Sequence, residues 1–416
     1  MGSSSTTIIL QIGGFQMEMK NVTVIDSVMG AGKTTYAIDY INGASPLERF
    51  IYVTPFLAEV DRVISSVTGR EFVQPTKNVE GGSKLTSLKR LIEDGRDIVA
   101  THSLFEMADD ELRYLLRENN YTLILDEVIS VIDKAGVSPS DMRLLLDKGL
   151  VKMENNKVVW TASEVEYEYG VFDRIKLLAQ AGTLFYHRDK YLIYAFPPSI
   201  FETFTSVYVL TYLFEAQLMK YYFELYSIPY DLKAVKDGQL IEYDKHQEGR
   251  EHLRSLISLY DGPHNDHGSV PTAFSKGWLS RRSDGEMAAI RSSMQSYVRN
   301  IIKAKTDEVL WTTIKSYQTD LKGKGYTKGF LACNARASNE YADRSTLMYC
   351  YNRYMHPIEK SFFQDHDITV SEDKLAVSDL LQWVWRSRIR NGESINLYMP
   401  ARRMRELLEK WARYEI

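Results

Sequence analysis

The chain has 416 residues, 44% of them hydrophobic and 25% charged, which is an ordinary composition for a globular protein with room for two domains. No apolar run reaches the length that crosses a bilayer, no basic segment precedes the short apolar stretch near the start, and two cysteines, Cys333 and Cys350, are too few for a disulfide framework, so we expect a cytoplasmic protein. The net charge of −4 excludes a uniformly basic surface but allows a local basic groove, for which the candidates are Arg386, Arg388, Arg390, Arg402, Arg403 and Arg405.

Short β-branched runs alternate with helical patterns through the first half of the chain. We predict strands within residues 22–26, 49–55, 97–103 and 121–127, and a helix over residues 34–43. This alternation predicts a parallel sheet covered on both faces, in which ligands bind beyond the carboxyl ends of the strands. Thr54, Thr101 and Asp126 stand at such ends, so we expect them to face a site.

Residues 128–205 interrupt this pattern. Within them, residues 183–196 alternate apolar and polar side chains and predict a β-hairpin, after which residues 207–214 resume the buried-strand pattern. The polar stretch 233–249 indicates a boundary, and later strands are predicted at residues 272–275, 329–334 and 395–400. We therefore predict an α/β fold with a first lobe at 1–235, interrupted by an insertion at about 128–205, and a second lobe at 236–416.

The sequence VIDSVMGAGKTTYAIDYI has the pattern of a phosphate-binding turn between a strand and a helix. Glycines at positions 30 and 32 would let backbone N–H groups approach phosphate oxygens, and the helix N-terminus adds partial positive charge. Lys33 would reach the β- and γ-phosphates and Thr34 would hold Mg²⁺. The strict pattern requires glycine where this chain has Ser27, but a looser version fits. The predicted nucleotide-binding residues are Ser27, Gly30, Ala31, Gly32, Lys33, Thr34 and Thr35.

A second signal is the strand sequence YTLILDEV, which ends in two acidic residues. Asp126 would bind Mg²⁺ through water, and Glu127 would orient and deprotonate the attacking water. Together with the phosphate-binding turn, this pair predicts hydrolysis of a nucleoside triphosphate with ATP and Mg²⁺ as cofactors. The two motifs do not say what the hydrolysis drives.

In motif order, the chain resembles superfamily 2 DEAD/DEAH-like helicases, especially compact phage-type members. SVMGAGKT resembles motif I and LILDEV resembles motif II, although Val128 stands where many relatives carry Ala or Glu. The resemblance implies two RecA-like lobes in tandem with the nucleotide between them. It also implies nucleic-acid contacts by Thr54 and Pro55 and by Thr101 and His102.

Motif III, which couples hydrolysis to strand movement in that family, has two candidates. One contains Thr161 in WTASEV, and the other contains Thr211 in VYVLTYLF. We prefer Thr211, because it ends a predicted buried strand and a helix follows, as in the family. This choice makes residues 128–205 an insertion in the first lobe.

The second half carries resemblances to motifs V and VI. ACNARASNEYADR resembles motif V, which implies nucleic-acid contacts by Asn334, Arg336 and Asn339. LLQWVWRSRIRNG resembles motif VI, but Trp385 replaces its glycine and Ile389 its last arginine.

On one helix, Gln382, Arg386 and Arg390 would share a face, while Leu381, Val384 and Trp385 would anchor another. Gly392 would end that helix. We predict Arg386 and Arg390 as arginine fingers, with Gln382 in the same catalytic group. Arg388 would contact the nucleotide, nucleic acid or an acidic side chain.

The sequence thus predicts a monomeric, nucleic-acid-dependent ATPase of helicase type, acting on single-stranded or duplex nucleic acid, with DNA favoured over RNA. By resemblance, we expect it in a bacterial or phage-infected cell, without a membrane partner. A packaging or terminase-type ATPase remains an alternative, as does a nucleotide-switched binding protein with little turnover. Polarity, pathway and strand separation as opposed to translocation or annealing stay open.

Overall fold

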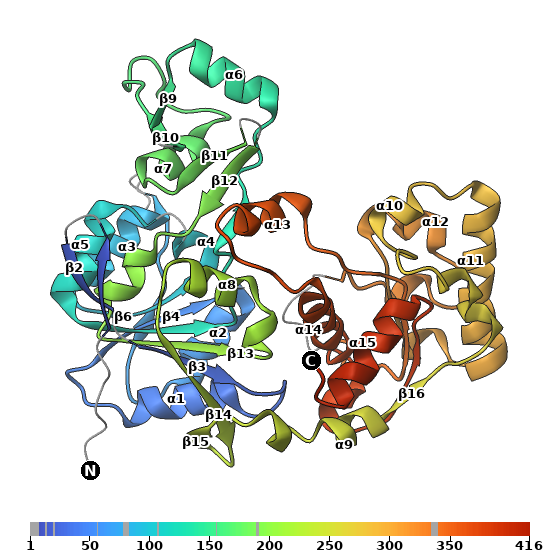
Figure 1. Ribbon diagram of the computed structural model, residues 1–416. Helices are drawn as coiled ribbons and strands as arrows, with labels where there is room; N and C mark the ends of the chain where they lie inside the picture. Colours follow the sequence, from blue (N-terminus) through green and yellow to red (C-terminus); the bar gives the residue numbers. More distant parts are fainter. Residues whose placement is uncertain are drawn as a thin grey trace. The chain divides into compact units, whose positions relative to one another are not determined.

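The computed structural model describes residues 8–12, 15–19, 21–55, 57–77, 83–105, 108–154, 156–188, 191–333 and 340–416 (Figure 1). They group into two compact units. Unit 1 takes the described residues of Met1–Ser27, Ala31–Tyr243 and His356–Val370. Unit 2 takes those of Val28–Gly30, Asp244–Met355 and Ser371–Ile416.

Unit 1 is built on an eight-stranded sheet whose strands are all parallel except the last hairpin strand, β15. In spatial order the strands are β15 (Gln239–Glu242), β14 (Tyr230–Lys236), β3 (Val22–Asp26), β13 (Ser206–Thr211), β7 (Tyr121–Asp126), β4 (Arg49–Thr54), β6 (Asp97–Thr101) and β5 (Phe72–Val73). The predicted strands at 22–26, 49–55, 97–103, 121–127 and 207–214 are therefore all present.

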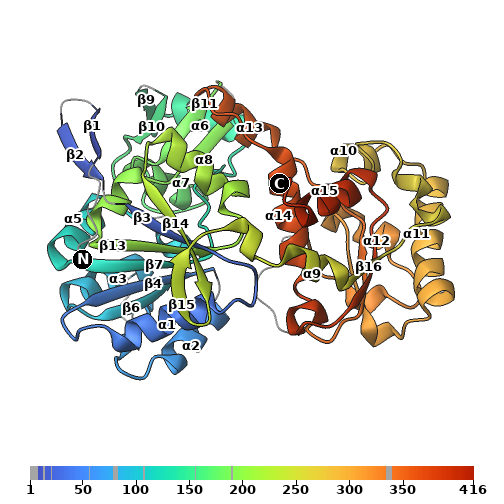
Figure 2. The same ribbon diagram turned by 60° about the horizontal axis from the view of Figure 1, so that its bottom comes forward.

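Helices connect these strands and cover the sheet. They are α1 (Lys33–Gly43), α2 (Leu57–Ser66), α3 (Lys84–Glu93), α4 (His102–Phe105), α5 (Asp110–Asn119) and α8 (Leu218–Leu225). Helices α1 and α2 lie on one face (Figure 2). There Ile41 and Val63 join Ile25, Phe50 and Ile124 of the strands in one buried cluster. This burial is what fixes α1, and with it the turn before it, against the sheet. A separate antiparallel hairpin, β1 (Ile8–Ile12) and β2 (Phe15–Met19), precedes β3.

A small domain is inserted between β7 and β13. Its antiparallel sheet has the order β8 (Ile132–Lys134), β12 (Tyr191–Ala195), β11 (Leu184–His187), β10 (Lys157–Trp160) and β9 (Val151–Glu154). Helices α6 (Pro139–Asp147) and α7 (Asp173–Gln180) accompany it. The predicted hairpin at 183–196 is β11 and β12, with Leu184 opposite Tyr194. The interruption in the strand pattern is thus a folded insertion.

Helix α13 (Pro357–Gln364) groups with unit 1, although the chain on either side of His356–Val370 belongs to unit 2. Its side chains contact the inserted hairpin: Ser361 Oγ lies 3.0 Å from His187 Nε2, and Asp365 accepts a hydrogen bond from Arg188 Nε at 2.8 Å. Phe363 is fully buried, with its ring near Tyr221 of α8. Nothing in the local sequence of this segment indicates that it packs in the other unit.

Unit 2 holds a four-stranded parallel sheet in the order β16 (Ile257–Leu259), β19 (Ile395–Tyr398), β18 (Thr346–Tyr349) and β17 (Val309–Thr312). Its helices are α9 (Arg250–Ser255), α10 (Lys276–Leu279), α11 (Asp284–Ser296), α12 (Gln318–Leu321), α14 (Glu372–Val384) and α15 (Arg402–Ala412), and a π-helical turn, η5 (Tyr297–Ile302), continues α11. The short 3-10 turns used below are η6 (Thr306–Glu308), η8 (Thr327–Gly329) and η9 (Arg388–Asn391).

Two strands predicted in the second half are wrong. Residues 272–275 form a turn, since Phe274 takes a left-handed conformation with φ of 64° that an extended strand does not allow. In residues 329–333 only Phe330 makes an isolated bridge, to Trp311. The sheet of unit 2 instead contains β17 and β18, which were not predicted from the sequence. Each has four residues and is buried on both faces, so its sequence shows no alternation of apolar and polar residues.

The predicted fold class is confirmed in its architecture: the protein is α/β, with a largely parallel sheet in each of two units and an insertion in the first. Among the described residues, no helix is both long enough and apolar enough to span a bilayer.

Candidate nucleotide-binding site

Polar side chains gather at the carboxyl edge of the unit 1 sheet, because five neighbouring strands run parallel and end in register. Asp26 of β3 pairs with Thr211 of β13, whose neighbour Leu210 pairs with Asp126 of β7. Further along, Thr54 of β4 pairs with Thr101 of β6. Parallel pairing therefore collects, along one edge, residues separated by up to 185 positions in the chain.

The phosphate-binding turn leaves β3 at this edge and enters α1. Gly30 and Gly32 have φ of 87° and 88°, the left-handed region that glycine adopts at little cost. A side chain at Gly32 would meet no atom within 4 Å, so the backbone angle is what requires glycine there. The ammonium of Lys33 lies over the turn and donates to the carbonyl oxygen of Ser27 at 2.5 Å. Thr34 and Thr35 follow in the first turn of α1.

Asp126 ends β7 in a largely enclosed position. The Tyr52 hydroxyl donates to its Oδ2 at 2.9 Å. Burial, reinforced by the neighbouring charge of Glu127, raises the pKa of Asp126 to about 6. Burial also keeps the pKa of Tyr52 well above its usual range, so this hydroxyl stays a donor at neutral pH. A bound divalent cation would favour the charged carboxylate, so Asp126 suits the metal-binding role predicted for it.

Glu127 directly follows β7, and Thr211 ends the neighbouring strand β13. The backbone of Glu127 has a φ of 71°, unusual for a residue with a side chain, and its N–H donates to the carbonyl of Leu210 at 2.9 Å. Thr211 ends β13 between β3 and β7, and is fully buried. The other motif III candidate, Thr161, follows β10 in the insertion, where its hydroxyl donates to the carbonyl of Gly149. The structure thus places Thr211, and not Thr161, at the candidate site.

The hydrogen bonds that Asp26, Ser27 and Tyr52 make at this edge were not predicted from the sequence. The buried carboxylate of Asp26 accepts hydrogen bonds from the backbone N–H groups of Leu213 and Phe214, both at 2.8 Å. The hydroxyl of Ser27 accepts from the Val235 N–H at 2.9 Å, and the Ser27 N–H donates to the carbonyl of Thr211. A polar residue ending a buried strand was the available signal for Asp26. Nothing in sequence pointed to Tyr52, which sits inside an apolar strand.

The predicted nucleic-acid contacts differ in their exposure. Thr101 and Pro55 are half-buried at the carboxyl edge, where a nucleic-acid strand could reach them. His102 is 8% exposed, and Thr54 is fully buried beneath the surface, so its hydroxyl is not available to a phosphate in this conformation. Asn334, Arg336 and Asn339 lie outside the described residues.

The single helix expected to carry Gln382, Arg386 and Arg390 on one face is wrong. Helix α14 ends at Val384, and Arg390 belongs to the separate turn η9. The break falls at Ser387, which is buried and extended and whose hydroxyl donates to the carbonyl of Val384 at 2.7 Å. Gln382 lies in the last turn of α14, and Arg386 lies in the turn that follows the helix.

Around this break, three apolar residues predicted to anchor the helix are buried: Leu381, Val384 and Trp385. Gly392, with φ of 77°, ends η9 rather than α14. The side chain of Arg388 donates to the carbonyl of Ser394 at 2.6 Å and lies 4.0 Å from Glu393. Of the partners predicted for Arg388, the structure shows an acidic side chain of its own loop.

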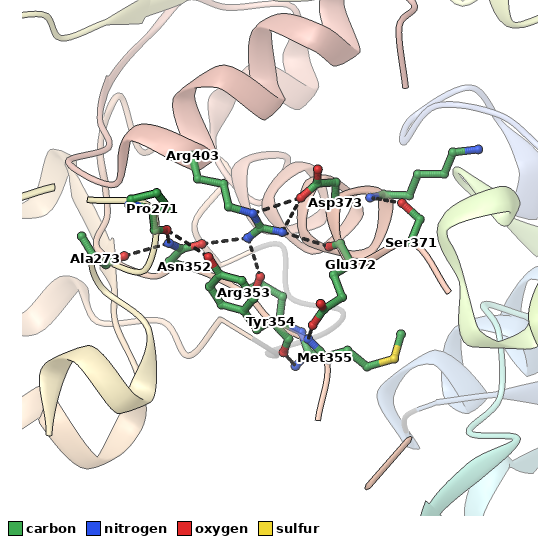
Figure 3. Close-up of polar contacts among 11 residues, drawn as sticks. Pro271, Ala273, Asn352, Arg353, Tyr354, Met355, Ser371, Glu372, Asp373 and Arg403 are labelled. Carbon is green, nitrogen blue, oxygen red and sulfur yellow. Dashed lines mark hydrogen bonds and ion pairs between the residues drawn. The ribbon is translucent and has the colours of Figure 1, made fainter. Parts of the chain in front are cut away.

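A hydrogen-bonded network fixes the beginning of α14 (Figure 3). Arg403, at the start of α15, donates to Asp373 Oδ1 from Nη2 at 2.6 Å and to Asn352 Oδ1 from Nη1 at 2.8 Å. The Asn352 amide in turn donates to the carbonyls of Pro271 and Ala273, both at 2.8 Å. Charge-assisted bonds of this kind hold the beginnings of α14 and α15 to the segment that follows β18.

The residues at the carboxyl edge of the unit 1 sheet offer few side chains that could hold a triphosphate and a magnesium ion. Among the described residues, no group of three or more His, Cys, Asp or Glu gathers to hold a metal by itself. The carboxylate of Asp126 and the hydroxyl of Thr34 would therefore share Mg²⁺ with phosphate oxygens and water, as in sites where the substrate supplies ligands. The glycine turn and Lys33 supply the complementary positive potential.

Two family models and one curated protein match this chain. A family model described as the YonV C-terminal Rossmann-like domain matches residues 251–412, and one described as the YonV middle domain matches residues 132–194. The chain is 42% identical over 406 residues to the SPbeta prophage-derived uncharacterized protein YonV of Bacillus subtilis strain 168, covering 94% of this chain and 99% of that protein.

Solved structures give weaker likenesses. An XPD helicase aligns with a TM-score of 0.46 and 11% identity over 94% of this chain and 95% of that one. Xpd4 of S. tokodaii aligns with a TM-score of 0.48 and 12% identity over 95% and 94%. The helicase MrfA bound to DNA and AMPPNP gives 0.36 and 11% over 94% and 47%.

The raised pKa of Asp126 predicts a pH-dependent stability in metal-free protein. Because the native carboxyl binds its proton more tightly than the unfolded one, the free energy of unfolding falls as pH rises from about 4 to about 6. Asp126→Asn cannot ionise, so at pH 8 with EDTA it should be more stable than wild type by about 2–3 kcal/mol, and no more stable at pH 4. Urea unfolding at both pH values measures this.

A matched control is Asp133→Asn, an exposed carboxylate in β8 whose removal should leave the pH profile unchanged. Equal stability of wild type and Asp126→Asn at pH 8 would contradict a raised pKa of Asp126 in the folded protein.

Proposed function

The chain belongs to the YonV family, and we propose that it is an ATP hydrolase of helicase type that works on nucleic acid, as its resemblance to superfamily 2 implies. The observation that carries the proposal is the joint arrangement of the phosphate-binding turn after β3 and the Asp126–Glu127 pair after β7. Both stand at one carboxyl edge, separated only by the strand that ends in Thr211. A chance glycine turn would not be matched by two acidic residues at that place.

The proposed chemistry follows from the side chains at this edge. Gly30, Gly32 and Lys33 bind the phosphates, and Thr34 and Asp126 hold the magnesium ion. The ion neutralises charge on the phosphate oxygens when bound. Glu127, held at the strand end by its backbone bond to Leu210, orients the attacking water and accepts its proton.

Thr211 is the proposed coupling residue. Its carbonyl binds the N–H of Ser27 in the phosphate strand, and its side chain is enclosed between β3 and β7. A displacement at the phosphate-binding turn would therefore be felt in β13 and in the segment that Asp26 fixes after it. Arg386 and Arg390 are the proposed arginine fingers and Gln382 their neighbour, as the resemblance to motif VI implies.

The proposed partner is DNA, bound as a single strand or duplex. Pro55, Thr101 and His102 are the contacts proposed in unit 1, and Asn334, Arg336 and Asn339 are those proposed in the second half of the sequence. The prophage origin of the Bacillus subtilis relative supports a phage-type setting, and the two free cysteines are consistent with the cytoplasm of a bacterial host.

Lys33→Ala should abolish ATP hydrolysis, lowering turnover by at least about 100-fold, because the phosphates lose their main cation. Glu127→Gln should lose turnover by a similar factor yet still bind ATP, since only the proton acceptor is gone. Phosphate release and nucleotide binding are the measurements. The control Lys84→Ala removes an exposed lysine and should behave as wild type. Normal hydrolysis by folded Lys33→Ala would refute the site.

Arg386→Ala and Arg390→Ala should each reduce kcat by roughly 100- to 1000-fold, with less change in the affinity for ATP, because fingers act on charge that develops in the transition state. Steady-state kinetics separates the two effects. Arg388→Ala serves as the comparison, since that side chain bonds its own loop. If kcat is the same in all three variants and wild type, neither arginine is a finger.

Single-stranded DNA should stimulate ATP hydrolysis, and the stimulation should weaken as salt rises from roughly 50 to 200 mM, because phosphate contacts release counterions. An ATPase assay with single-stranded DNA, duplex DNA and RNA tests this. Stimulation by duplex DNA alone, together with a ring on a sizing column, would favour the packaging-type alternative. Turnover that no nucleic acid changes would contradict the helicase-type assignment.

A further inference from the structure

The arginine-rich C-terminal run supplies less accessible charge than its sequence suggests. Of its six arginines, Arg388 donates to the carbonyl of Ser394, and Arg405 donates to the carbonyls of Met399 and Pro400. Arg402 pairs with Glu406 at 2.7 Å, and Arg403 is engaged in the network at the start of α14. Four of the six guanidinium groups thus bind local partners, which leaves this run little free charge for a nucleic-acid surface.

Residues 291–328 of unit 2 hold such a surface. They contain eight Lys and Arg against three Asp and Glu, in a chain whose net charge is −4. Seven of these basic residues are exposed, and six of them lie in or beside the turns described below: Arg299, Lys303, Lys305, Lys322, Lys324 and Lys328. We call these six the basic surface. In the described part of unit 2, none of the six has an ion-pair partner, so their charge faces solvent.

The fold brings the basic surface together from three separate turns. Arg299 lies in η5, and its Cγ stands 3.6 Å from the position that a side chain on Gly325 would take, so it lies over the loop that carries Lys324. Gly329 packs so closely on the carbonyl of Val309 that no side chain fits there. This close approach sets η8, with Lys328, beside the end of η6.

Hydrogen bonds hold these turns in place. The Ala304 N–H donates to the carbonyl of Val298 at 3.0 Å, which fixes the loop just after Lys303. The backbone N–H of Lys305 donates to Glu308 Oε2 at 2.8 Å. A surface on pinned backbone loses less entropy when it binds than one on free loops. The carboxylates of this stretch are Asp307, Glu308 and Asp320, and they leave a clear positive excess.

The chemistry of the basic surface favours a stacked duplex over an unstacked strand. Proteins that hold single strands usually combine cationic side chains with exposed aromatic rings on which bases stack. Here the aromatic residues are covered: Tyr297, Trp311 and Tyr326 are fully buried and Tyr317 is half-buried. What remains exposed is charge, which matches a phosphate backbone read without its bases.

From this charge and this lack of exposed rings, we propose that the basic surface binds the backbone of duplex DNA independently of sequence. The proposal rests on the proposed function, since it assigns a duplex-binding surface to the same nucleic-acid motor. It adds a site outside the nucleotide-binding edge and outside the motifs named above. Its role would be to keep the duplex attached to unit 2 without taking part in hydrolysis.

The test compares Arg299→Glu/Lys303→Glu/Lys324→Glu with wild type in the full chain, by fluorescence anisotropy of a labelled 20-base-pair duplex and a single-stranded 20-mer. We expect duplex affinity to fall by ~10-fold or more, and the slope of log affinity against log salt to become shallower by about 2 to 3 for three lost phosphate contacts. Single-strand affinity and basal ATP hydrolysis should change less than about 2-fold.

Two further variants keep the test independent of folding and of net charge. Arg299→Gln/Lys303→Gln/Lys324→Gln only neutralises the surface and should show a smaller loss of the same kind. Lys77→Glu/Lys84→Glu/Lys148→Glu makes the same change in net charge at exposed lysines of unit 1 and should bind duplex as wild type.

Unchanged duplex binding by both basic-surface variants would overturn the proposal, and so would an equal loss for single-stranded and duplex DNA. A loss in the unit 1 control as large as in the basic-surface variant would also overturn it, since net charge alone would then explain the effect. Wild-type protein that hydrolyses ATP but binds no duplex refutes the basic surface and leaves the nucleotide site standing. Wild type that binds duplex as described without hydrolysing ATP refutes the ATPase proposal instead.

Discussion

Parallel pairing of β3, β13, β7 and β4 in one register is the constraint on which the candidate site depends. Strand direction and register together decide that Asp26, Thr211, Asp126 and Thr54 end at one edge. A slip of one residue in any of these strands would turn its terminal polar group toward the opposite face of the sheet. The apolar residues of the same strands resist such a slip, because they are buried against α1 and α2 on one side of the sheet.

The same edge contains a desolvated carboxylate and an unfavourable backbone conformation, two destabilising features that are common at functional sites. Asp126 is enclosed with a raised pKa, and Glu127 holds a backbone conformation that side chains usually avoid. Neither feature helps the fold by itself. Local hydrogen bonds hold both in place, from Tyr52 to the carboxylate and from the Glu127 N–H to Leu210. This concentration of strain and desolvation at the end of one strand is what distinguishes the edge from an ordinary sheet border.

Unit 2 shows why counts of charged residues and maps of accessible charge differ. Arginine forms several directed hydrogen bonds at once, so it is readily drawn into structural networks such as that of Arg403 with Asn352 and Asp373. Lysine on an exposed turn stays hydrated and available. The C-terminal arginines and the basic surface of residues 299–328 illustrate the two outcomes in one domain. The segment His356–Val370 gives a further contrast, since it joins two parts of unit 2 yet packs with the insertion of unit 1.

The sequence alone determined the features whose causes are local. A glycine turn between an apolar strand and a helix, an apolar strand ending in Asp126 and Glu127, and a hairpin pattern at 183–196 each rest on neighbouring residues, and each element stands where it was predicted. Tertiary structure alone decided the rest. Which threonine adjoins the phosphate strand depended on the pairing of β13, and the helix expected through Arg390 ended early because burial of Ser387 and Ile389 outweighed helical spacing. The strands β17 and β18, the contact of Tyr52 with Asp126 and the placement of α13 all arise from partners far away in the chain, whose contact energies no local pattern of residues encodes.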